Sequence, residues 1–408
     1  MSGPTDVTGV AGARSAEAAA DVESLLASMV RIDTVNAAVS GRAEAERPLA
    51  EHLERCAAAY GLASRRLPVA GCGFNLLLSH EVSADAGWLL FESHLDTVGV
   101  AGMEDPFTPR IEAGRMWGRG SCDTKGSGAA MLWALRRYAA EGGGAGNVGL
   151  LLSVDEEIGK RGINAFVASQ LPGLGWRPAA AVVGEPTGLR CVTAHKGVVR
   201  WTITAEGLAA HSSDPSRGRS AISAIVEVVR AIEQRYVPSL DARHPLVGSA
   251  VCSVNLIAGG SQINVIPDRA EIQIDRRTVP GERGEDVRPA VEALLEELRR
   301  RRPEFRISQG EAMVDPPLDP AGSVWWAAAV GEVLAERGLD PEPVGVGYGT
   351  DASTLGAAGI PSVVLGPGDI AVAHTTREHL ELAELHRAVE VYLGLMRRGP
   401  RSEVRGAE

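Results

Sequence analysis

Residues 87–96 read GWLLFESHLD, an apolar run that ends in a histidine and an aspartate. Three other stretches share this design, namely VGLLLSVDEE (148–157), AAAVVGEP (179–186) and IPSVVLGPG (360–368). Short apolar runs that stop at charged residues, glycine or proline are typical of buried strands. Helical patterns at 126–140 and 160–170 lie between these runs. Strands that alternate with helices in this way predict an α/β fold, with a mostly parallel sheet flanked by helices.

The pattern changes after Gly197, where the expected strands become half-exposed. VVRWTITAEG (198–207), SAVCSVNLIAGG (249–260) and RAEIQIDRRTV (269–279) alternate apolar and polar residues, and helical patterns lie between and after them. This order predicts an inserted α+β domain of the ferredoxin-like kind, with one sheet face open. The expected division is a first domain in two parts, 1–196 and 309–408, around a second domain at 197–308.

Composition narrows the functional classes. The formal charge of −11 argues against a nucleic-acid partner, since nucleic-acid binders normally present a basic face. No apolar run reaches the roughly 20 residues of a membrane span, and no secretory signal is visible. Residues 1–15 are expected to be disordered, and the polar tail at 397–408 is expected to be frayed. Five scattered cysteines without a CxxC pair are typical of reduced thiols, so we expect a cytoplasmic protein.

Seven ionisable side chains stand at the ends or turns of the apolar runs. They are His94, Asp96, Asp123, Glu156, Glu157, Glu185 and His374. Charged groups in such places are costly unless they are paired, and carboxylates and imidazoles are common protein ligands of divalent ions. Because ligands of α/β sheets gather outside the carboxyl ends of the strands, we expect these side chains to meet in one two-metal site.

Each of these residues also has an ordinary structural interpretation. The HxD pair at 94–96 fits a capped strand end, Asp123 fits the N-cap of the following helix, and the acidic pair at 156–157 fits a solvated loop. The glycine-rich GRGSCDTKGSGAA (118–130) looks like a phosphate loop, but the GxxxxGK[ST] spacing is absent. An acid also stands where backbone amides should meet an anion.

Lysine is rare in this chain. Of 41 basic residues only three are lysines, and all three, Lys125, Lys160 and Lys196, lie close in sequence to candidate site residues. Chance placement in an arginine-rich chain is one explanation. The other is that Lys125 and Lys196 need the compact ammonium of lysine in place of the planar fork of arginine.

Seven motifs, taken together, resemble a known family. HLDTV, GRGSCDTKG, DEEIG, GEPT, AHSS, NVIPDRAEIQIDRRTVPGE and GPGDIAVAHTTREH occur in the order found in the dinuclear zinc amidohydrolases. This family includes acetylornithine deacetylase, succinyl-diaminopimelate desuccinylase, aminoacylase and carboxypeptidase G. The resemblance covers residues 20 to 395 and implies the zinc-exopeptidase fold with an inserted lid and dimerisation domain.

The resemblance implies roles for all seven residues. It implies two divalent ions, most often zinc, with cobalt or manganese as alternatives. The five implied ligands are His94, Asp123, Glu157, Glu185 and His374. Asp123 bridges the ions, Glu156 is the general base for a metal-bridging hydroxide, and Asp96 orients His94. The resemblance also implies a cis peptide bond between Asp123 and Thr124.

Three residues of the expected second domain receive roles from the same resemblance. His211 in GLAAHSS matches the residue that stabilises the oxyanion, which in relatives reaches across a dimer into the partner's site. Arg277 and Asn264 match positions that bind the carboxylate and the carbonyl of the substrate. By itself, His211 fits a surface histidine before a turn, and Arg277 fits a cross-strand charge. The resemblance implies a homodimer formed through this domain.

Departures from the family pattern bear on the substrate. Desuccinylases usually carry GRRG where this chain has His195-Lys196-Gly197, and often an arginine near Ser353; both are absent. HKG, YGTDAS and GPGDIAVAH look closest to acetylornithine deacetylases. Ser220 replaces the usual asparagine of the GxNAI motif, which allows a shifted specificity. The expected reaction removes an acyl group from an N-acyl amino acid. A dipeptidase or carboxypeptidase, and a non-catalytic metal-binding relative, are the alternatives.

Overall fold

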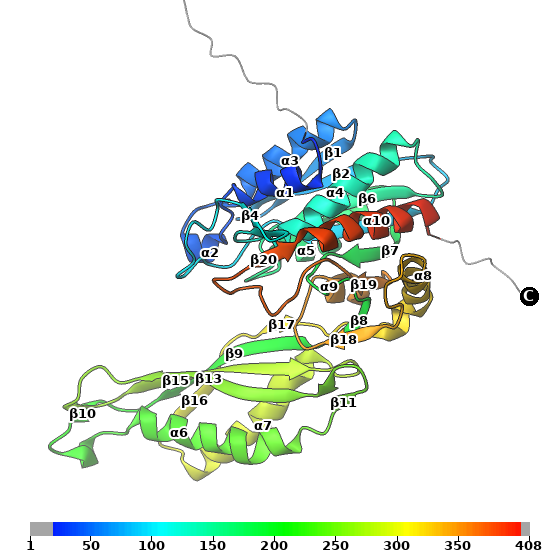
Figure 1. The fold of residues 1–408 in the computed structure, drawn as a ribbon. Helices are drawn as coiled ribbons and strands as arrows, with labels where there is room; N and C mark the ends of the chain where they lie inside the picture. The colour runs from blue at the N-terminus through cyan, green and yellow to red at the C-terminus, as the bar shows by residue number, and fades with distance from the viewer. Residues whose placement is uncertain (1–18, 401–408) are drawn as a thin grey trace, which may run out of the picture.

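The computed structural model describes residues 19–400, so the predicted leader at 1–15 and most of the predicted tail lie outside the described residues. An eight-stranded mixed sheet forms the larger unit of the molecule (Figure 1). Its strands in spatial order are β1 (Ala63–Val69), β2 (Gly73–His80), β6 (Asn147–Ser153), β3 (Trp88–His94), β7 (Pro178–Val183), β19 (Ser362–Val364), β8 (Val192–His195) and β18 (Val344–Val346). The four central strands, from β6 to β19, pair in parallel, which confirms the α/β prediction.

Alternate side chains of the central strands enter two separate cores. Leu150 and Leu152 of β6 belong to one core, and Leu151 between them belongs to the other. The reason is that successive residues of a strand face opposite sides of the sheet. Burial on both faces explains why these strands are continuously apolar rather than alternating.

Helices cover both faces of this sheet (Figure 1). The first core is closed by α1 (Val22–Val30), α3 (Arg47–Ala59), α4 (Lys125–Ala140), α8 (Val324–Ala335) and α10 (Leu382–Arg398). The second core is closed by α5 (Arg161–Ala165) and α9 (Ala352–Ala357). None of the described helices combines the length and the apolar character that crossing a bilayer requires. Each of the five cysteines is free in the structure, as their scattered spacing predicts.

Most predicted elements of this unit are present, with two kinds of difference. The helix expected at 126–140 is α4, whereas the one expected at 160–170 is α-helical only to Ala165 and continues as a π-helical turn over Phe166–Gln170. The hairpin of β1 and β2 has no counterpart in the sequence prediction. Neither has a small sheet of β4 (Arg110–Glu112), β5 (Arg115–Trp117) and β20 (His379–Glu381). Runs of three residues carry too little periodicity to be recognised.

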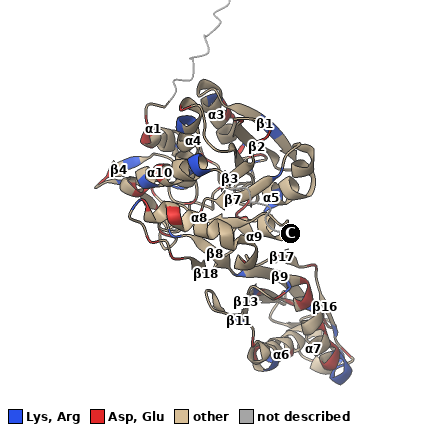
Figure 2. Ribbon diagram, turned by 90° about the vertical axis from the view of Figure 1, so that its right-hand side faces the viewer, with Lys and Arg blue, Asp and Glu red and all other residues tan. Residues whose placement is uncertain are grey.

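The second unit is built on its own five-stranded antiparallel sheet. Its strands are β13 (Val251–Gly259), β15 (Arg269–Thr278), β9 (Gly197–Glu206), β16 (Arg306–Gln309) and β17 (Met313–Asp315). Helices α6 (Ala221–Ala231) and α7 (Val287–Arg301) pack on one face around Ile203, Ile225 and Leu295. Figure 2 shows both signs of charge on α7, whose last turn is basic. The predicted α+β arrangement is present, and β17 extends its sheet past residue 308.

Two segments of chain join the units, and they lie side by side. His195 and Leu318 exchange backbone hydrogen bonds, with N–O distances of 3.4 and 3.2 Å. Gly197 has no room for a side chain, because a Cβ there would stand 2.6 Å from the backbone oxygen of Asp315. The two connecting segments are therefore packed closely against each other, and they lie next to the corner that carries the candidate site.

Candidate metal centre

The candidate site lies at the carboxyl ends of the parallel strands. His94 is the last residue of β3, and Glu185 follows the end of β7. Glu157 lies in the loop after β6, and His374 lies in the loop after β19. Asp123 comes from the turn that leads into α4. Five segments far apart in the sequence therefore bring one ligand-type side chain each to the same corner.

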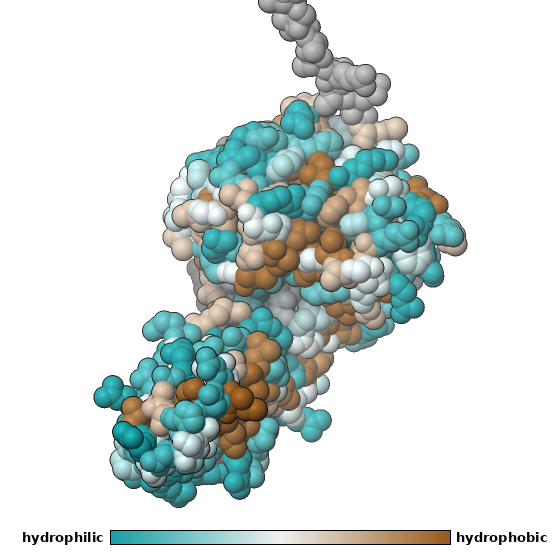
Figure 3. Space-filling model, turned by 90° about the vertical axis from the view of Figure 1, so that its left-hand side faces the viewer, coloured by the Kyte–Doolittle hydropathy of each residue, from teal (hydrophilic) through white to brown (hydrophobic). Residues whose placement is uncertain are grey.

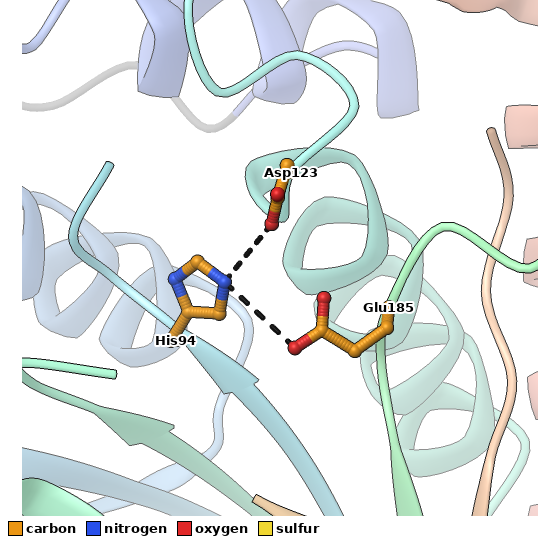
Figure 4. Close-up of side chains that lie close together, drawn as sticks. All are labelled: His94, Asp123 and Glu185. Carbon is orange, nitrogen blue, oxygen red and sulfur yellow. Dashed lines mark hydrogen bonds and ion pairs between the residues drawn. The ribbon is translucent and has the colours of Figure 1, made fainter. Parts of the chain in front are cut away.

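Two groups of three ligand-type side chains form at this corner, and Asp123 belongs to both. One group is His94, Asp123 and Glu185 (Figure 4), the other is Asp123, Glu157 and His374, and ligand atoms within each lie within 4.8 Å of one another. His94 Nε2 is 3.1 Å from Asp123 Oδ1 and 3.9 Å from Glu185 Oε1. His374 Nε2 is 3.0 Å from Asp123 Oδ2 and 3.2 Å from Glu157 Oε2. Each carboxylate oxygen of Asp123 thus faces the histidine of a different group.

Asp123 does not act as a helix cap, the alternative that its sequence position allows. The N-cap residue of α4 is Thr124, and its side chain makes no capping hydrogen bond. The Asp123–Thr124 bond is cis, as the family resemblance implies. The turn is held by Glu378, whose Oε1 accepts the backbone N–H groups of Cys122 and Asp123, both at 3.0 Å. Sequence reasoning missed Glu378, whose only signal is one more acid in HTTREH.

Asp96 holds the loop that carries the two glutamates. Its Oδ1 accepts the backbone N–H of Glu156 at 3.0 Å, and its Oδ2 accepts that of Glu157 at 3.2 Å. Asn36 Nδ2 also donates to Asp96 Oδ2, at 2.8 Å. His94 Nδ1 is 3.0 Å from the backbone oxygen of Asp96 but 3.5 Å from its carboxylate. The Asp96 carboxylate thus holds the loop amides and also lies beside the imidazole of His94, whose Nδ1 faces the Asp96 backbone oxygen as well.

The ionisable groups of this corner shift the protonation of one another. Burial, together with the charge of Asp123, raises the pKa of Glu157 to about 7 and that of Glu185 well above its usual value. Hydrogen bonds with Asp123 and Glu157 raise the pKa of His374 to about 10. Burial acts to raise the pKa of Asp123, but the contacts with His374 and His94 outweigh it and lower the pKa. The buried acids of this corner therefore lack positive charge to balance them.

The donor set fits a pair of divalent ions. Each group offers one imidazole nitrogen and two carboxylate oxygens, which is the three-ligand chemistry of catalytic zinc sites that leave a position open. A divalent ion placed among such atoms would supply the positive charge that these buried acids lack. The first group is fully buried, whereas His374 of the second group is exposed, so the pair of sites opens on that side.

Glu156 lies beside these groups without belonging to either. Its side chain is 11% exposed and that of Glu157 is 7% exposed, so the two do not form the solvated loop that their sequence also permits. Glu156 lines a cavity of about 350 Å³ together with Glu157, His374 and Arg277. Burial raises the pKa of Glu156, and the ammonium of Lys160 counters this effect. A carboxylate placed in this way is suited to proton transfer.

The predicted residues of the second unit fall in two places. Arg277 lines the cavity from β15, and its Nε donates to Asp275 Oδ1 at 2.6 Å, so the structure is compatible with both of its interpretations. His211 and Asn264 are exposed and lie next to each other, at β10 (Ala210–His211) and β14 (Val265–Ile266). Figure 1 shows β10 at the end of this unit that is far from the eight-stranded sheet. Within a single chain, neither residue lines the cavity.

The fold and the donor set are those of a metal-dependent hydrolase, and comparisons with known proteins give its family. A family model described as peptidase family M20/M25/M40 matches residues 90–398. An acetylornithine deacetylase of Myxococcus xanthus is 34% identical over 283 residues, which cover 68% of this chain and 71% of that one. A probable carboxypeptidase of Aspergillus clavatus is 30% identical over 332 residues, which cover 74% and 72% of the two chains.

A solved structure shares the whole architecture. The M20 family metallo-carboxypeptidase from Sulfolobus solfataricus has a TM-score of 0.72 at 18% identity, and the match covers 93% of this chain and 99% of that chain. The fold, the site and these similarities agree. The chain belongs to the peptidase family M20/M25/M40, and it is a hydrolytic enzyme, an amidohydrolase or metallopeptidase.

Proposed function

We propose that this enzyme is a two-metal amide hydrolase that removes an acyl group from an N-acyl amino acid, in the manner of acetylornithine deacetylase. The observation that carries the proposal is the position of Asp123, whose two oxygens lie 3.1 and 3.0 Å from histidines of two different ligand groups. Glu156 reaches the adjoining cavity. The similarity to the acetylornithine deacetylase of Myxococcus xanthus supports the acyl-amino-acid substrate.

The proposed mechanism assigns separate tasks to the residues of the corner. The residues that would hold the ions, with zinc proposed first and cobalt or manganese as alternatives, are His94, Asp123, Glu157, Glu185 and His374. When bound, two such ions lower the pKa of a water molecule and polarise the amide carbonyl. Glu156 takes the proton of the attacking water and delivers it to the leaving nitrogen. Asp96 keeps Glu156 in place, because its carboxylate holds the backbone N–H of that residue.

Arg277 is the proposed anchor for the free carboxylate of the substrate. A guanidinium can bind a carboxylate through two parallel hydrogen bonds, which also fixes the orientation of the ligand. Asp275 accepts from the Nε of Arg277 at 2.6 Å and from its Nη2 at 3.3 Å, and this contact orients the guanidinium in the wall of the cavity. A substrate with a free carboxylate next to its amide bond suits this arrangement.

We also propose that two copies associate through the second unit, taken as residues 197–308. β13 is an edge strand of its sheet, and its Leu256 and Ile257 are each 61% exposed. On α6, Ile222 and Val226 are 41% and 44% exposed. Figure 3 shows apolar side chains gathered on the surface of this smaller unit. An unpaired strand edge beside exposed apolar side chains is the kind of surface that a second sheet edge covers.

Association of two copies gives His211 and Asn264 a function. Both are exposed at one end of the second unit, away from their own cavity. In the proposed dimer they enter the cavity of the partner, where His211 stabilises the oxyanion and Asn264 contacts the substrate carbonyl. Mixed dimers of His211→Asn and Glu156→Gln chains test this. A site built from both chains predicts about a quarter of wild-type activity from a random mixture, whereas a site within one chain predicts none.

A carboxypeptidase or dipeptidase is the second candidate, and one observation favours it. The probable carboxypeptidase of Aspergillus clavatus matches 74% of this chain, slightly more than the deacetylase does. Both reactions use the same base, the same ions and the same carboxylate anchor. They differ in the group that occupies the acyl side of the cavity, which is an aminoacyl group in a peptide and a simple acyl group in the first candidate.

Glu156→Gln tests the chemistry of both candidates. The substitution keeps the shape of the side chain and removes the base, so kcat should fall about 10³-fold. Metal content, measured by mass spectrometry, should stay at the wild-type level. The matched control is Glu311→Gln, at a fully exposed glutamate. Full activity of Glu156→Gln would remove this residue from the mechanism.

A substrate panel separates the two candidates. It consists of N-acetyl, N-formyl and N-succinyl amino acids and of dipeptides with the same carboxyl-terminal residues. The proposal predicts the highest kcat/KM among the N-acyl amino acids. Faster hydrolysis of the dipeptides would select the second candidate, and no turnover of any compound by the metal-loaded wild-type enzyme would contradict both.

A further inference from the structure

Lys160 lies among three carboxylates, one of which is that of Glu156, and the mechanism above assigns it no role. Its Nζ is 2.8 Å from Asp315 Oδ2, 3.6 Å from Glu156 Oε1 and 3.9 Å from Asp351 Oδ1. The side chain of Lys160 is 15% exposed, and those of Asp315 and Asp351 are 6% and 1% exposed. Within residues 19–400, no other basic side chain lies within 4.0 Å of the Glu156 carboxylate.

Two of the three carboxylates lie closest to this ammonium, those of Asp315 and Glu156, at 2.8 and 3.6 Å. The third, Asp351, is the most deeply buried, and burial, reinforced by the nearby Glu92 and Glu156, raises its pKa well above its usual value. One ammonium is therefore shared between an acid at the junction of the two units and the proposed general base.

Asp315 fixes the place of the ammonium, because it is held from both units. It is the last residue of β17, which pairs with β9 of the smaller sheet. Its Oδ1 accepts from Ser353 Oγ of α9 at 3.1 Å, which ties it to the larger unit. The next residues lead to Leu318, whose backbone pairs with His195 of the other segment that connects the two units. The ion pair of Lys160 therefore connects the Glu156 loop to the junction of the two units.

The backbone of the loop indicates that its lysine is needed for the side chain. Asp155 and Lys160 stand at its two ends with φ angles of 63° and 50°. This left-handed region favours glycine, and a residue with a Cβ adopts it at some cost. Glycine at position 160 would suit the backbone better. A lysine in such a conformation, in a chain with only three lysines, points to a use for the ammonium.

We propose that Lys160 is a positioning residue for Glu156: its ammonium, held by Asp315, keeps the Glu156 carboxylate directed into the cavity and connects the base to the junction of the two units. The inference rests on the proposed function of Glu156. At 3.6 Å the contact is a charge interaction and not a short hydrogen bond, so the carboxylate remains free to accept a proton. Without the ammonium, the Glu156 carboxylate would lose its one basic partner among the described residues, and with it the contact that directs it into the cavity.

Steady-state kinetics of three variants test the proposal. Lys160→Met should lower kcat about 10- to 100-fold and change KM less than about threefold, because the substrate contacts stay in place. Lys160→Arg should recover part of the loss, since it restores the charge. The control is Arg283→Met, which removes an exposed positive charge of the second unit from a side chain that is 75% exposed. This control should retain wild-type kcat.

The double variant Lys160→Met/Asp315→Asn separates positioning from simple charge balance. Lys160→Met alone leaves Asp315 buried without its ion pair, which lowers the thermal unfolding midpoint. Asp315→Asn removes that unpaired charge, so the midpoint should recover while kcat stays low. Recovery of kcat together with the midpoint would overturn the proposal, because Lys160 would then only neutralise Asp315. A raised KM at unchanged kcat in Lys160→Met would also overturn it and assign Lys160 to substrate binding.

A spectroscopic measurement tests the contact without any turnover. With lysine as the only isotope-labelled residue, the side-chain Cε and Nζ signals of the chain come from three residues. Lys160→Met and Lys196→Met spectra assign these signals. In metal-free protein, Glu156→Gln should shift the Lys160 signals and leave those of Lys125 and Lys196 in place. Unmoved Lys160 signals would overturn the proposal. If the wild-type enzyme hydrolysed none of the substrates while these signals shifted, the proposed reaction would fail and the Lys160–Glu156 contact would stand.

Discussion

The metal centre and the exposed apolar surface of β13 and α6 differ in the kind of side chain that is out of place. At the centre, His94, Asp123 and Glu185 are buried although they are ionisable. On β13 and α6, large apolar side chains such as Leu256 and Ile257 face solvent. Buried charge and exposed apolar surface are both costly for an isolated chain. The first arrangement supports the proposed metal ions, and the second supports the proposed association of two copies.

The largest expected effect comes from Asp123, the residue common to both ligand groups. Asp123→Ala removes a ligand from each group. The wild type is expected to bind about two ions per chain, and the variant should bind fewer. Its kcat/KM should fall by at least about 10³-fold. Metal analysis and kinetics measure the two effects. Glu311→Ala serves as the control, and retention of both ions by Asp123→Ala would contradict the shared-ligand assignment.

The next largest effect should come from the exposed apolar side chains of β13. The double substitution Leu256→Glu/Ile257→Glu places two like charges on this edge strand, and it should weaken the proposed dimer at least about 100-fold. Sedimentation velocity measures the change from dimer to monomer. Val324→Glu is the control, because Val324 is 67% exposed but lies on α8 of the larger unit. If both variants stayed dimeric, the interface would lie elsewhere.

Glu46 is a buried acid outside the two ligand groups, and the pH dependence of the free energy of unfolding reports its pKa. Burial, helped by the charge of Asp96, raises its pKa to about 7. Because the folded-state pKa is above the unfolded value, the stability linked to this group is fully present below about pH 4 and is lost as pH rises through about 7. Glu46→Gln should therefore gain about 2 to 3 kcal/mol in free energy of unfolding, relative to wild type, between pH 4.5 and pH 8.

Urea unfolding at the two pH values measures the effect of Glu46→Gln. The exposed Glu81→Gln is the matched control. If the difference in free energy of unfolding between Glu46→Gln and wild type did not change with pH, the pKa of Glu46 would not be raised in the folded protein, and the prediction would be wrong.

The smallest expected effect concerns Arg277. Arg277→Met should lower kcat/KM about tenfold for an N-acyl amino acid, because one charge-assisted contact with the substrate is lost. The corresponding α-carboxamide, which has no carboxylate for Arg277 to bind, should be affected much less by the same substitution. Equal losses for the two compounds would assign Arg277 to its structural pair with Asp275 alone.

Much of the larger unit could be predicted from the sequence because its signals are local. The run at 87–96 and its three counterparts are continuously apolar, and they became strands of one sheet as expected. The hairpin of β1 and β2 escaped prediction because β1 is an edge strand with an exposed first half, ASRR, in which polar residues outnumber apolar ones. Edge strands need to bury only part of their surface, so their sequences carry a weaker pattern.

The candidate site could be predicted as a set of residue types but not as a set of contacts. Strand-end acids and histidines mark the corner, and the family resemblance implied their roles. The sequence could not show that Asp96 binds the amides of Glu156 and Glu157, that Glu378 holds the turn of Asp123, or that Lys160 approaches Glu156 from an ion pair with Asp315. These partners are 60 to 255 positions apart in the chain. The exception is the pair of Lys160 and Glu156, which belong to one loop and are four residues apart.

The sequence by itself therefore determined the class of fold and the chemical character of the corner, because burial patterns and ligand types are properties of single residues and short runs. Only the tertiary structure decided which oxygen of Asp123 faces which histidine, and which carboxylates share the ammonium of Lys160. The physical reason is that charge interactions in a protein depend on distances of a few ångströms between side chains, and the path of the chain between them sets those distances.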